Sequence, residues 1–170
     1  MRQLLQDDMR TNNWGCKCIR CREIKGNAIS SLDNIKLNVE IYRASDCNEY
    51  HISFDTDCDK NYLIGFLRLR LNGLSEDKDD TAPSSQVLPC IKGCALIREL
   101  HVYSNLNSVG DNIEGSLQHK GFGKQLVAKA EEIAANNGYR RIAIISGAGV
   151  RGYYKKLGYE LIDTYMIKEI

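Results

Sequence analysis

Apolar and polar residues alternate along several stretches in the first part of the chain. A period of two is typical of strands with one buried face. It predicts strands over 35–43 (IKLNVEIYR), 51–57 (HISFDTD) and 61–71 (NYLIGFLRLRL), and a further strand over 94–103 (CALIRELHVY). The short polar turn between the second and third of these predicts a hairpin.

The spacing of apolar residues becomes helical after residue 123. The stretch KQLVAKAEEIAANN predicts a helix that ends at Gly138. RIAIISG (141–147) is a nearly continuous apolar run, typical of a strand buried on both faces. VRGYYKKLGY (150–159) predicts a short helix and ELIDTYMIKEI (160–170) a last strand. This order of elements predicts an α+β domain, with a central mixed sheet flanked by helices.

The remaining segments are polar. Residues 1–27, with a short helix predicted at 2–10, precede a domain that we place at 28–170, and loops are predicted at 72–93 and 104–117. No run approaches the roughly 18 apolar residues of a membrane span. Two aspartates near the N-terminus stand where a signal peptide would be apolar, so we expect an intracellular protein.

Composition excludes several classes of protein. The 170 residues are 43% hydrophobic and 26% charged, which excludes a disordered or collagen-like chain. The 23 basic residues are balanced by 22 acidic ones, which argues against a general nucleic-acid coat protein. Between His119 and Lys156, however, eight basic residues face only two acidic ones. An anion could bind there.

The segment QHKGFGK, which opens the predicted helix, is the first candidate for such a site. Glycines allow backbone N–H groups to approach an anion, and the helix dipole favours negative charge there, so a pyrophosphate is the expected ligand. A tight turn or plain helix cap is the structural alternative. The third glycine and acidic residue of a dinucleotide-binding fold are absent, and so is the Walker pattern.

The wider context resembles a known superfamily. Q-x-x-G-x-G before a helix, followed by a buried strand and YYKKLGY, is similar to the GNAT acetyltransferases. RCREI, LIGFLRLRL, IRELHVY, QHKGFGKQL, IAIISGAGVRGYYKKLGY and YMIKEI further resemble the C-terminal acetyltransferase domain of the Elongator catalytic subunit, which modifies the tRNA wobble uridine. The resemblance implies acetyl-CoA as cofactor and tRNA as partner. The family's N-terminal radical S-adenosylmethionine domain is not in this sequence, so a separate radical domain or Elongator-like partner is a further expectation.

The resemblance also implies the cofactor residues. The pyrophosphate should lie on the start of the helix, and the pantetheine arm along strand 98–103, with backbone hydrogen bonds from Leu100 and Val102. Ser146 and Gly147 should leave room for the acetyl end. Arg151 and Lys124 are the first candidates for the CoA 3′-phosphate, whereas the other basic residues lie on a solvated face or contact RNA. The full expected set is Leu100, His101, Val102, Gln118, His119, Lys120, Gly121, Phe122, Gly123, Lys124, Gln125, Ser146, Gly147, Arg151 and Tyr154.

Three residues are catalytic candidates. Tyr154, four residues before Gly158, should lie near the cofactor sulfur and donate to the departing thiolate. The resemblance implies that the Tyr153–Tyr154 pair is important for activity but does not say how the role is divided between them. Two tyrosines that only pack in the core are the alternative. Glu99 could be a general base, although a strand glutamate is more often solvated or paired. In addition to these three, His101 on the same face could act as a base or in a water relay, although a hydrogen-bonded core histidine is the more common role.

Cys16, Cys18 and Cys21 form the second candidate site. Three thiols within six residues suit one soft ion, and the family resemblance supports structural zinc. Three free thiols are the alternative. Seven cysteines without an export signal argue against a disulfide framework. A fourth ligand would come from another domain or from this set: Cys47, His51, Cys58, Cys90 and Cys94.

Three functions therefore stand. The first is an Elongator-type domain that uses or hydrolyses acetyl-CoA in tRNA wobble-uridine modification. The second is a stand-alone acetyltransferase for protein lysines or small amines. The third is a catalytically silent module that binds tRNA or a protein partner, which the intact glycine loop disfavours.

Overall fold

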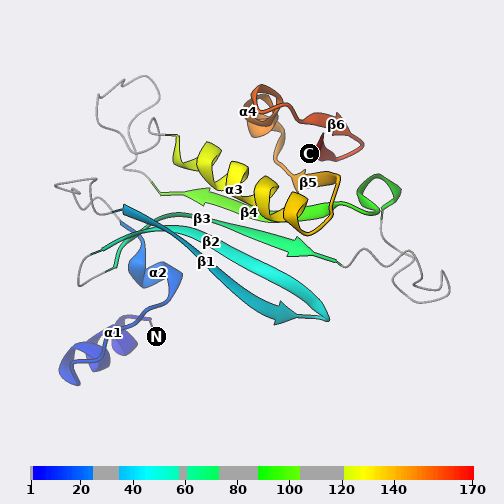
Figure 1. Ribbon diagram of the computed structural model, residues 1–170. Coiled ribbons are helices and arrows are strands. Elements are labelled where there is room, and N and C mark those ends of the chain that lie inside the picture. Colours follow the sequence, from blue (N-terminus) through cyan, green and yellow to red (C-terminus); the bar gives the residue numbers. More distant parts are fainter. Residues whose placement is uncertain (1, 25–34, 58–60, 73–87, 104–120) are drawn as a thin grey trace.

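The protein is built on one mixed β-sheet. The computed structural model describes residues 2–24, 35–57, 61–72, 88–103 and 121–170, and their seven strands form one sheet in the order β1-β2-β3-β4-β5-β7-β6 (Figure 1). The strands are β1 (Ile35–Ala44), β2 (Cys47–Thr56), β3 (Leu63–Leu71), β4 (Ala95–Val102), β5 (Arg141–Ile145), β6 (Glu160–Ile162) and β7 (Tyr165–Glu169). Only β4 and β5 are parallel neighbours among these strands. The predicted α+β fold with a mixed sheet is confirmed.

Strands β1 to β4 form an antiparallel meander. The β1–β2 hairpin turns at Ser45 and Asp46, both with positive φ, as a tight primed turn requires. We predicted that the second strand begins at residue 51, and this is wrong, because β2 begins at Cys47. The error comes from Glu49, a charged residue that looks like a loop position but is only 1% exposed.

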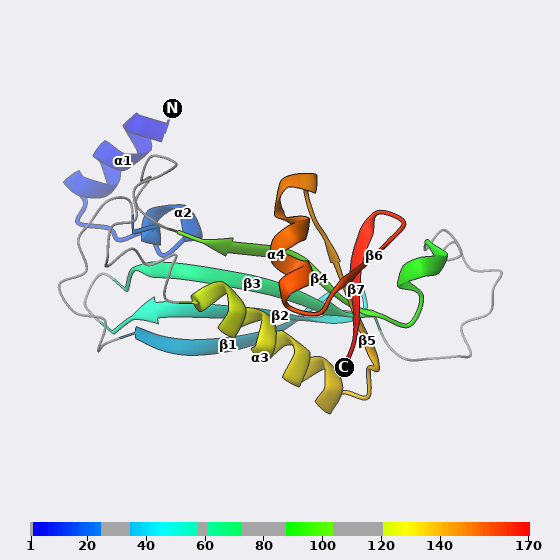
Figure 2. The same ribbon diagram turned by 90° about the horizontal axis from the view of Figure 1, so that it is seen from above.

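Helix α3 (Phe122–Asn136) covers one face of the meander, and Figure 2 shows it running diagonally over these strands. Its apolar side packs on alternate residues of β2 and β3 to form the main core. The predicted helical face is confirmed, and so is the C-terminal stop, where Gly138 adopts a φ of 84°. The buried residues of α3 are Phe122, Leu126, Val127, Ala130, Ile133 and Ala134.

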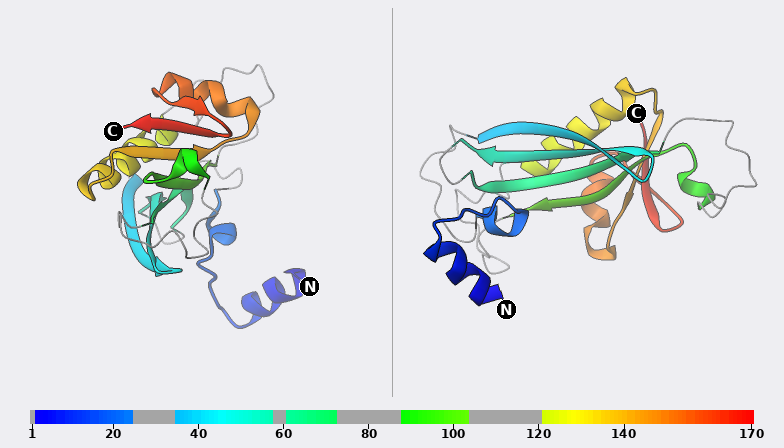
Figure 3. Two further views of the ribbon diagram at one scale, coloured as in Figure 1. Left: turned by 90° about the vertical axis from the view of Figure 1, so that its right-hand side faces the viewer. Right: turned by 90° about the horizontal axis from the view of Figure 1, so that it is seen from below.

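Among the described helices, the one that covers the opposite face of the meander is α2 (Ile19–Arg22), and it does so at one end. There α2 follows α1 (Arg2–Thr11), and Arg22 donates to Asp55 of β2 at 2.9 Å. The right-hand view of Figure 3 shows this face from below, with α2 at one end and no other described helix over β1 to β4. The helix predicted at 2–10 is confirmed. No helix in the described ranges is long and apolar enough to cross a membrane.

The C-terminal part completes the sheet. After β5, a single 3-10 turn (Ala148–Val150) leads into α4 (Arg151–Lys156), and a second 3-10 turn (Pro89–Ile91) precedes β4. The single strand predicted at 160–170 is wrong, because the chain folds there into the β6–β7 hairpin. Asp163 turns that hairpin with a φ of 53°, and Asp-Thr is a turn signal that the apolar pattern around it obscured.

Candidate functional site

Strands β4 and β5 separate in the middle of the sheet. They pair only from Ala95↔Ile142 to Ile97↔Ile144, after which β4 continues to Val102 beside β3. Beyond Ile97, no described strand lies on the β5 side of β4. In the described part of the structure, the outer edge of β4 is therefore unpaired along Leu100 and Val102, as a bound extended chain would require.

A buried polar atom lies just beyond β5. The Ser146 Oγ is enclosed but has no hydrogen-bond partner among the described residues. Buried polar groups normally have a partner, so this hydroxyl marks a place where a ligand or water would complete the hydrogen bonding. Gly147, which follows it, is exposed, and a Cβ built there meets nothing within 4 Å.

Gly121 begins α3 in a left-handed conformation, with a φ of 71°, and no side chain caps the helix. Its carbonyl accepts from the Gln125 N–H at 3.0 Å, the first helical bond. The N–H groups of the first turn thus lack a side-chain acceptor, and a helix N-terminus in this state favours an anion. The exposed side chain of Lys124 adds positive charge beside it. Gln118, His119 and Lys120, also predicted here, lie outside the described residues.

Gly123 brings three elements together. A Cβ at this position would lie 2.9 Å from the Tyr153 Oη of α4 and 3.6 Å from a Val102 methyl of β4. The end of β4, the start of α3 and α4 therefore meet at one point. The predicted cofactor residues of these three segments are brought together by the fold, although they are separated in the sequence.

Tyr153 and Tyr154 have different environments. Tyr154 is 6% exposed and packs edge-on against both Tyr153 and Tyr159, with ring centroids 5.2 and 6.0 Å away. Tyr153 is 39% exposed and reaches Gly123 instead. Burial raises the pKa of both phenols, so each is a neutral hydrogen-bond donor at physiological pH.

The charged and aromatic residues of β4 lie toward the face opposite α3. Glu99 is exposed, and its carboxylate lies 3.7 Å from the Arg68 guanidinium. His101 packs against Tyr103, with ring centroids 4.4 Å apart. The two residues alternate on the same side of the strand, as predicted, opposite Arg68 and Phe66 of β3.

The predicted basic residues differ in burial and in hydrogen bonding. Arg151 is half-buried at the start of α4, and its Nε has no hydrogen-bond partner in the part of the chain that the structure describes. Arg141 instead donates to the Cys90 carbonyl at 3.4 Å. Arg140, Lys155 and Lys156 are exposed. Arg151 is thus the member of this set with a buried donor still to be satisfied.

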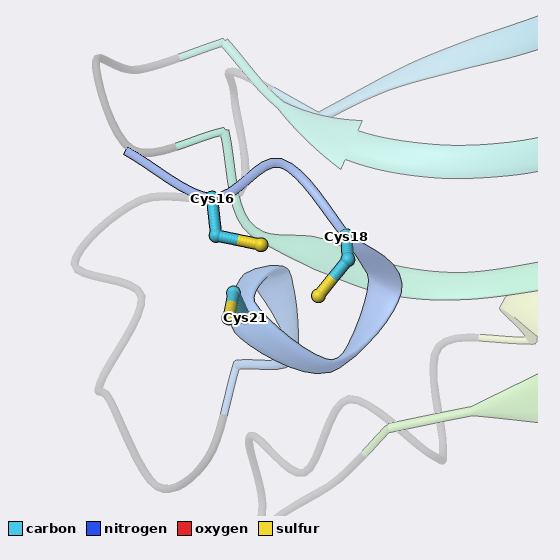
Figure 4. A group of neighbouring side chains, drawn as sticks. All are labelled: Cys16, Cys18 and Cys21. Atoms are coloured by element: carbon cyan, nitrogen blue, oxygen red, sulfur yellow. The ribbon is translucent and has the colours of Figure 1, made fainter. Parts of the chain in front are cut away.

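The cysteine cluster forms a second site on the N-terminal segment. The sulfurs of Cys16, Cys18 and Cys21 lie within 4.8 Å of one another around the start of α2 (Figure 4). Hydrogen bonds from Cys16 and Cys21 lower the pKa of Cys18 to about 7, while the bonds to Cys18 and Cys16 raise that of Cys21 to about 11. Among the described candidates for a fourth ligand, none joins this group. Cys58 lies outside the described residues.

One cluster was not predicted at all. The buried carboxylate of Glu49 accepts from Tyr42 at 2.8 Å, Arg68 at 3.2 Å and Arg70 at 3.3 Å, and also from Arg98. Burial alone would raise the pKa of Glu49, but the hydrogen bonds from Tyr42, Arg98 and Arg68 outweigh it and lower that pKa. The alternation in LIGFLRLRL placed Arg68 and Arg70 on one face, but nothing local pointed to Glu49.

Comparison with known proteins agrees with this geometry. The acetyltransferase (GNAT) family profile matches residues 112–159. The tRNA uridine(34) acetyltransferase of Methanocaldococcus jannaschii is 36% identical over 98% of this chain, and Elongator complex protein 3 of Saccharomyces cerevisiae is 34% identical over all of it. This chain covers 30% of each relative.

A solved structure matches as well. Archaeal Elp3 of Methanocaldococcus infernus, with an N-terminal deletion, superposes with a TM-score of 0.76 at 34% identity. The match covers 99% of this chain and 38% of that one. The chain thus spans about a third of the length of the relatives it matches.

Proposed function

Since this chain belongs to the GNAT acetyltransferase family, and within it to the Elongator type, we propose that it is an acetyl-CoA-dependent acetyltransferase domain acting in tRNA wobble-uridine modification. The observation that carries the proposal is the uncapped glycine start of α3 beside the open edge of β4. The relatives' names supply the substrate class.

The residues present fit acetyl-CoA. The first-turn N–H groups of α3, with Gly121, Gly123 and Lys124, would hold the pyrophosphate. The open edge of β4 at Leu100 and Val102 would hold the pantetheine arm. Two donors have no partner among the described residues, the Ser146 Oγ and the Arg151 Nε. The first would bind near the acetyl end, and the second would meet a phosphate of the cofactor.

When bound, acetyl-CoA supplies a thioester whose carbonyl carbon accepts a nucleophile and whose leaving group is a thiolate. Tyr154 would donate a hydrogen bond to that sulfur. Its raised pKa keeps the proton on the phenol at neutral pH, and its packing against Tyr159 restricts the ring to one orientation. Tyr153 would form the wall of the pyrophosphate site, because its hydroxyl lies over Gly123.

The environment of Glu99 does not favour an amine acceptor. A general base for an amine should be free to accept a proton, whereas Glu99 is paired with Arg68 and exposed to water. We therefore propose that tRNA is the partner during turnover. A protein lysine or small amine as acetyl acceptor is the alternative, which the experiment below would reveal.

We also propose a zinc ion at Cys16, Cys18 and Cys21. A tetrahedral zinc with bonds of about 2.3 Å holds its sulfurs roughly 4 Å apart, which agrees with the spacing of these three. Zinc would displace the remaining thiol protons and bind the three sulfurs as thiolates, whose charge it would partly neutralise. Its role would be structural, because it would fix the segment leading to α2.

The test is calorimetry with acetyl-CoA, combined with measurement of CoA release in the presence and absence of tRNA. Gly121→Glu places a carboxylate in the pyrophosphate position and should abolish binding. Gly93→Glu is its matched control, because Gly93 has the same φ of 71° and equally open surroundings but lies outside the site.

The outcomes separate the alternatives. Binding that Gly121→Glu abolishes and Gly93→Glu preserves, with CoA release stimulated by tRNA, supports the proposal. Acetylation of amines that needs no RNA would replace tRNA with an amine acceptor. An absence of acetyl-CoA binding by the wild-type chain would refute both.

A further inference from the structure

The Glu49 cluster carries more positive than negative charge. A carboxylate offers about four lone-pair positions, and Tyr42 and three arginines occupy them with one bond each. Three guanidinium groups thus converge on this one carboxylate, and their charge exceeds its own. Counting Glu99, which pairs with Arg68, the cluster still has one more positive than negative charge.

A second buried carboxylate on the same face shows the difference. Asp55 accepts from Arg22 at 2.9 Å, and its other partners are the neutral side chains of Asn38 and Ser53. That group is balanced in charge and stabilises the contact with α2. The Glu49 cluster lies on the same polar face of the sheet and also surrounds a buried carboxylate, but its arginines outnumber its carboxylates.

The excess positive charge of the cluster lies mainly on Arg98. Arg70 uses its remaining donors on the Asn72 side chain and the Ser45 carbonyl. Arg98 contributes one nitrogen to Glu49, and its side chain is 42% exposed. The rest of its donor fork therefore faces water, while the bond to Glu49 fixes its position.

The surroundings are open and adjacent to the proposed site. Arg98 lies at the β-bulge of β4, directly after Ile97, where β4 and β5 cease to pair. The β1–β2 connection is only the turn at Ser45 and Asp46, so no helix from that connection covers this end of the face. Figure 3 shows the strands uncovered there by the described helices.

We infer that Arg98, positioned by Glu49 and supported by the charge of Arg68 and Arg70, binds a phosphate of an RNA backbone on the face opposite α3. A guanidinium fork matches two phosphate oxygens, and a pre-positioned arginine loses little side-chain entropy on binding. The choice of RNA as the phosphodiester rests on the proposed function. The site would hold the nucleic acid across the sheet from the cofactor helix.

The experiment measures the affinity of the full chain for a tRNA transcript by fluorescence anisotropy at several salt concentrations. Arg98→Gln should weaken binding about threefold to tenfold and reduce the slope of log affinity against log salt by about 0.7 to 1, the loss of one phosphate contact. Arg98→Lys keeps the charge without the fork and should restore the slope but only part of the affinity.

The variants should fold, because Glu49 keeps Tyr42, Arg68 and Arg70 as partners, and thermal unfolding would verify this. Lys129→Gln, on α3, removes one charge from elsewhere and should leave the slope unchanged. An Arg98→Gln slope equal to that of the wild type would overturn the inference, and so would a wild-type chain with no salt-dependent affinity for RNA.

Two further results would assign the cluster to another ligand. If polyglutamate binds in an Arg98-dependent manner and RNA does not, the partner is an acidic protein. If Arg98→Gln weakens acetyl-CoA binding instead, the arginine belongs to the cofactor site. Arg98-dependent RNA binding in a chain that fails to bind acetyl-CoA would preserve this inference while the proposed function fails.

Discussion

The two adjacent tyrosines of α4 differ in what each hydroxyl can reach. Tyr154 is enclosed by Tyr153 and Tyr159, whereas Tyr153 lies over the glycine start of α3. A donor to the thiolate acts in the transition state, and a wall residue acts on cofactor binding. The pair can therefore be separated by measuring rate and affinity independently.

Tyr154→Phe should reduce the rate of CoA release about 100-fold with little change in acetyl-CoA affinity, because one positioned donor is lost. Tyr153→Phe is the matched control and should change that rate less than about fivefold. Single-turnover kinetics and calorimetry provide the two readouts. Equal rates in the two variants would remove the distinction between the tyrosines.

Glu49 should give the protein a specific acid sensitivity. Its folded pKa lies below the ordinary value of 4.5, so its charge stabilises the fold at higher pH, and this contribution is lost as the pH falls through the folded pKa. Glu49→Gln leaves the arginines without their counter-charge, and we expect a loss of about 3 kcal/mol at pH 7. Urea unfolding from pH 7 to pH 3 should show a weaker pH dependence in the variant, and an unchanged profile would contradict this.

Sequence reasoning predicted those residues whose signal is local. The glycines at the start of α3, the tyrosines of α4 and the three cysteines each lie within a short motif, and the structure describes all of them. The Glu49 cluster was missed because its members, Glu49 included, come from four different strands. Such a cluster can be recognised only when the register of the sheet is known.

At the scale of elements, α3 is attached to β7 by a single carboxylate. Glu131 accepts from Lys168 at 2.9 and 3.0 Å and from the Tyr159 hydroxyl at 2.8 Å. Burial is the main cause that raises the pKa of Tyr159 far above its usual range, so the phenol remains a donor. Because Tyr159 packs on Tyr154, this contact also supports the position of α4.

Glu131→Ala should lower the free energy of unfolding by about 2 kcal/mol, because it leaves a partly buried lysine and a buried phenol without their acceptor. Glu132→Ala is the matched control, since the Glu132 carboxylate is exposed and its partner among the described residues is Lys129. That variant should change stability by less than about 0.5 kcal/mol. Urea denaturation measures both, and similar losses would contradict the assignment.

The segment before the sheet should depend on metal. If zinc holds the three cysteines, Cys18→Ser should remove most of the bound zinc, measured by elemental analysis, and make residues 12–24 more sensitive to protease. Cys47→Ser, which changes a thiol in β2 outside the cluster, is the control. Equal zinc content in the wild type and Cys18→Ser would refute the site.

The number of elements was harder to predict than their type. All predicted helices and strands exist, yet β2 starts four residues earlier than predicted and the last strand is a hairpin. The first error comes from Glu49, a polar residue whose partners are tertiary, and the second from a turn signal at Asp163 that the apolar residues around it obscured. Periodicity reports which face is apolar, but it does not report where a charged residue is buried with an ion pair.

At the scale of the whole molecule, the two faces of the meander differ in the elements that cover them. One face packs against α3 and forms the main core, whereas the other bears the Glu49 cluster and, among the described helices, is covered by α2 at one end only. Under the inference drawn above, an RNA partner would bind on this second face, across the sheet from α3.

The single parallel pairing of β4 with β5 also has a consequence for how the protein folds. Strands β1 to β3 of the meander are joined by short connections, whose loops close at a small entropic cost, whereas β5 can join β4 only after the chain has passed through α3. We expect the meander to form first and the junction of the two strands last. The cofactor would then bind at the contact that forms latest, so acetyl-CoA should slow amide hydrogen exchange most strongly in β5 and α4 and least in the β1–β2 hairpin.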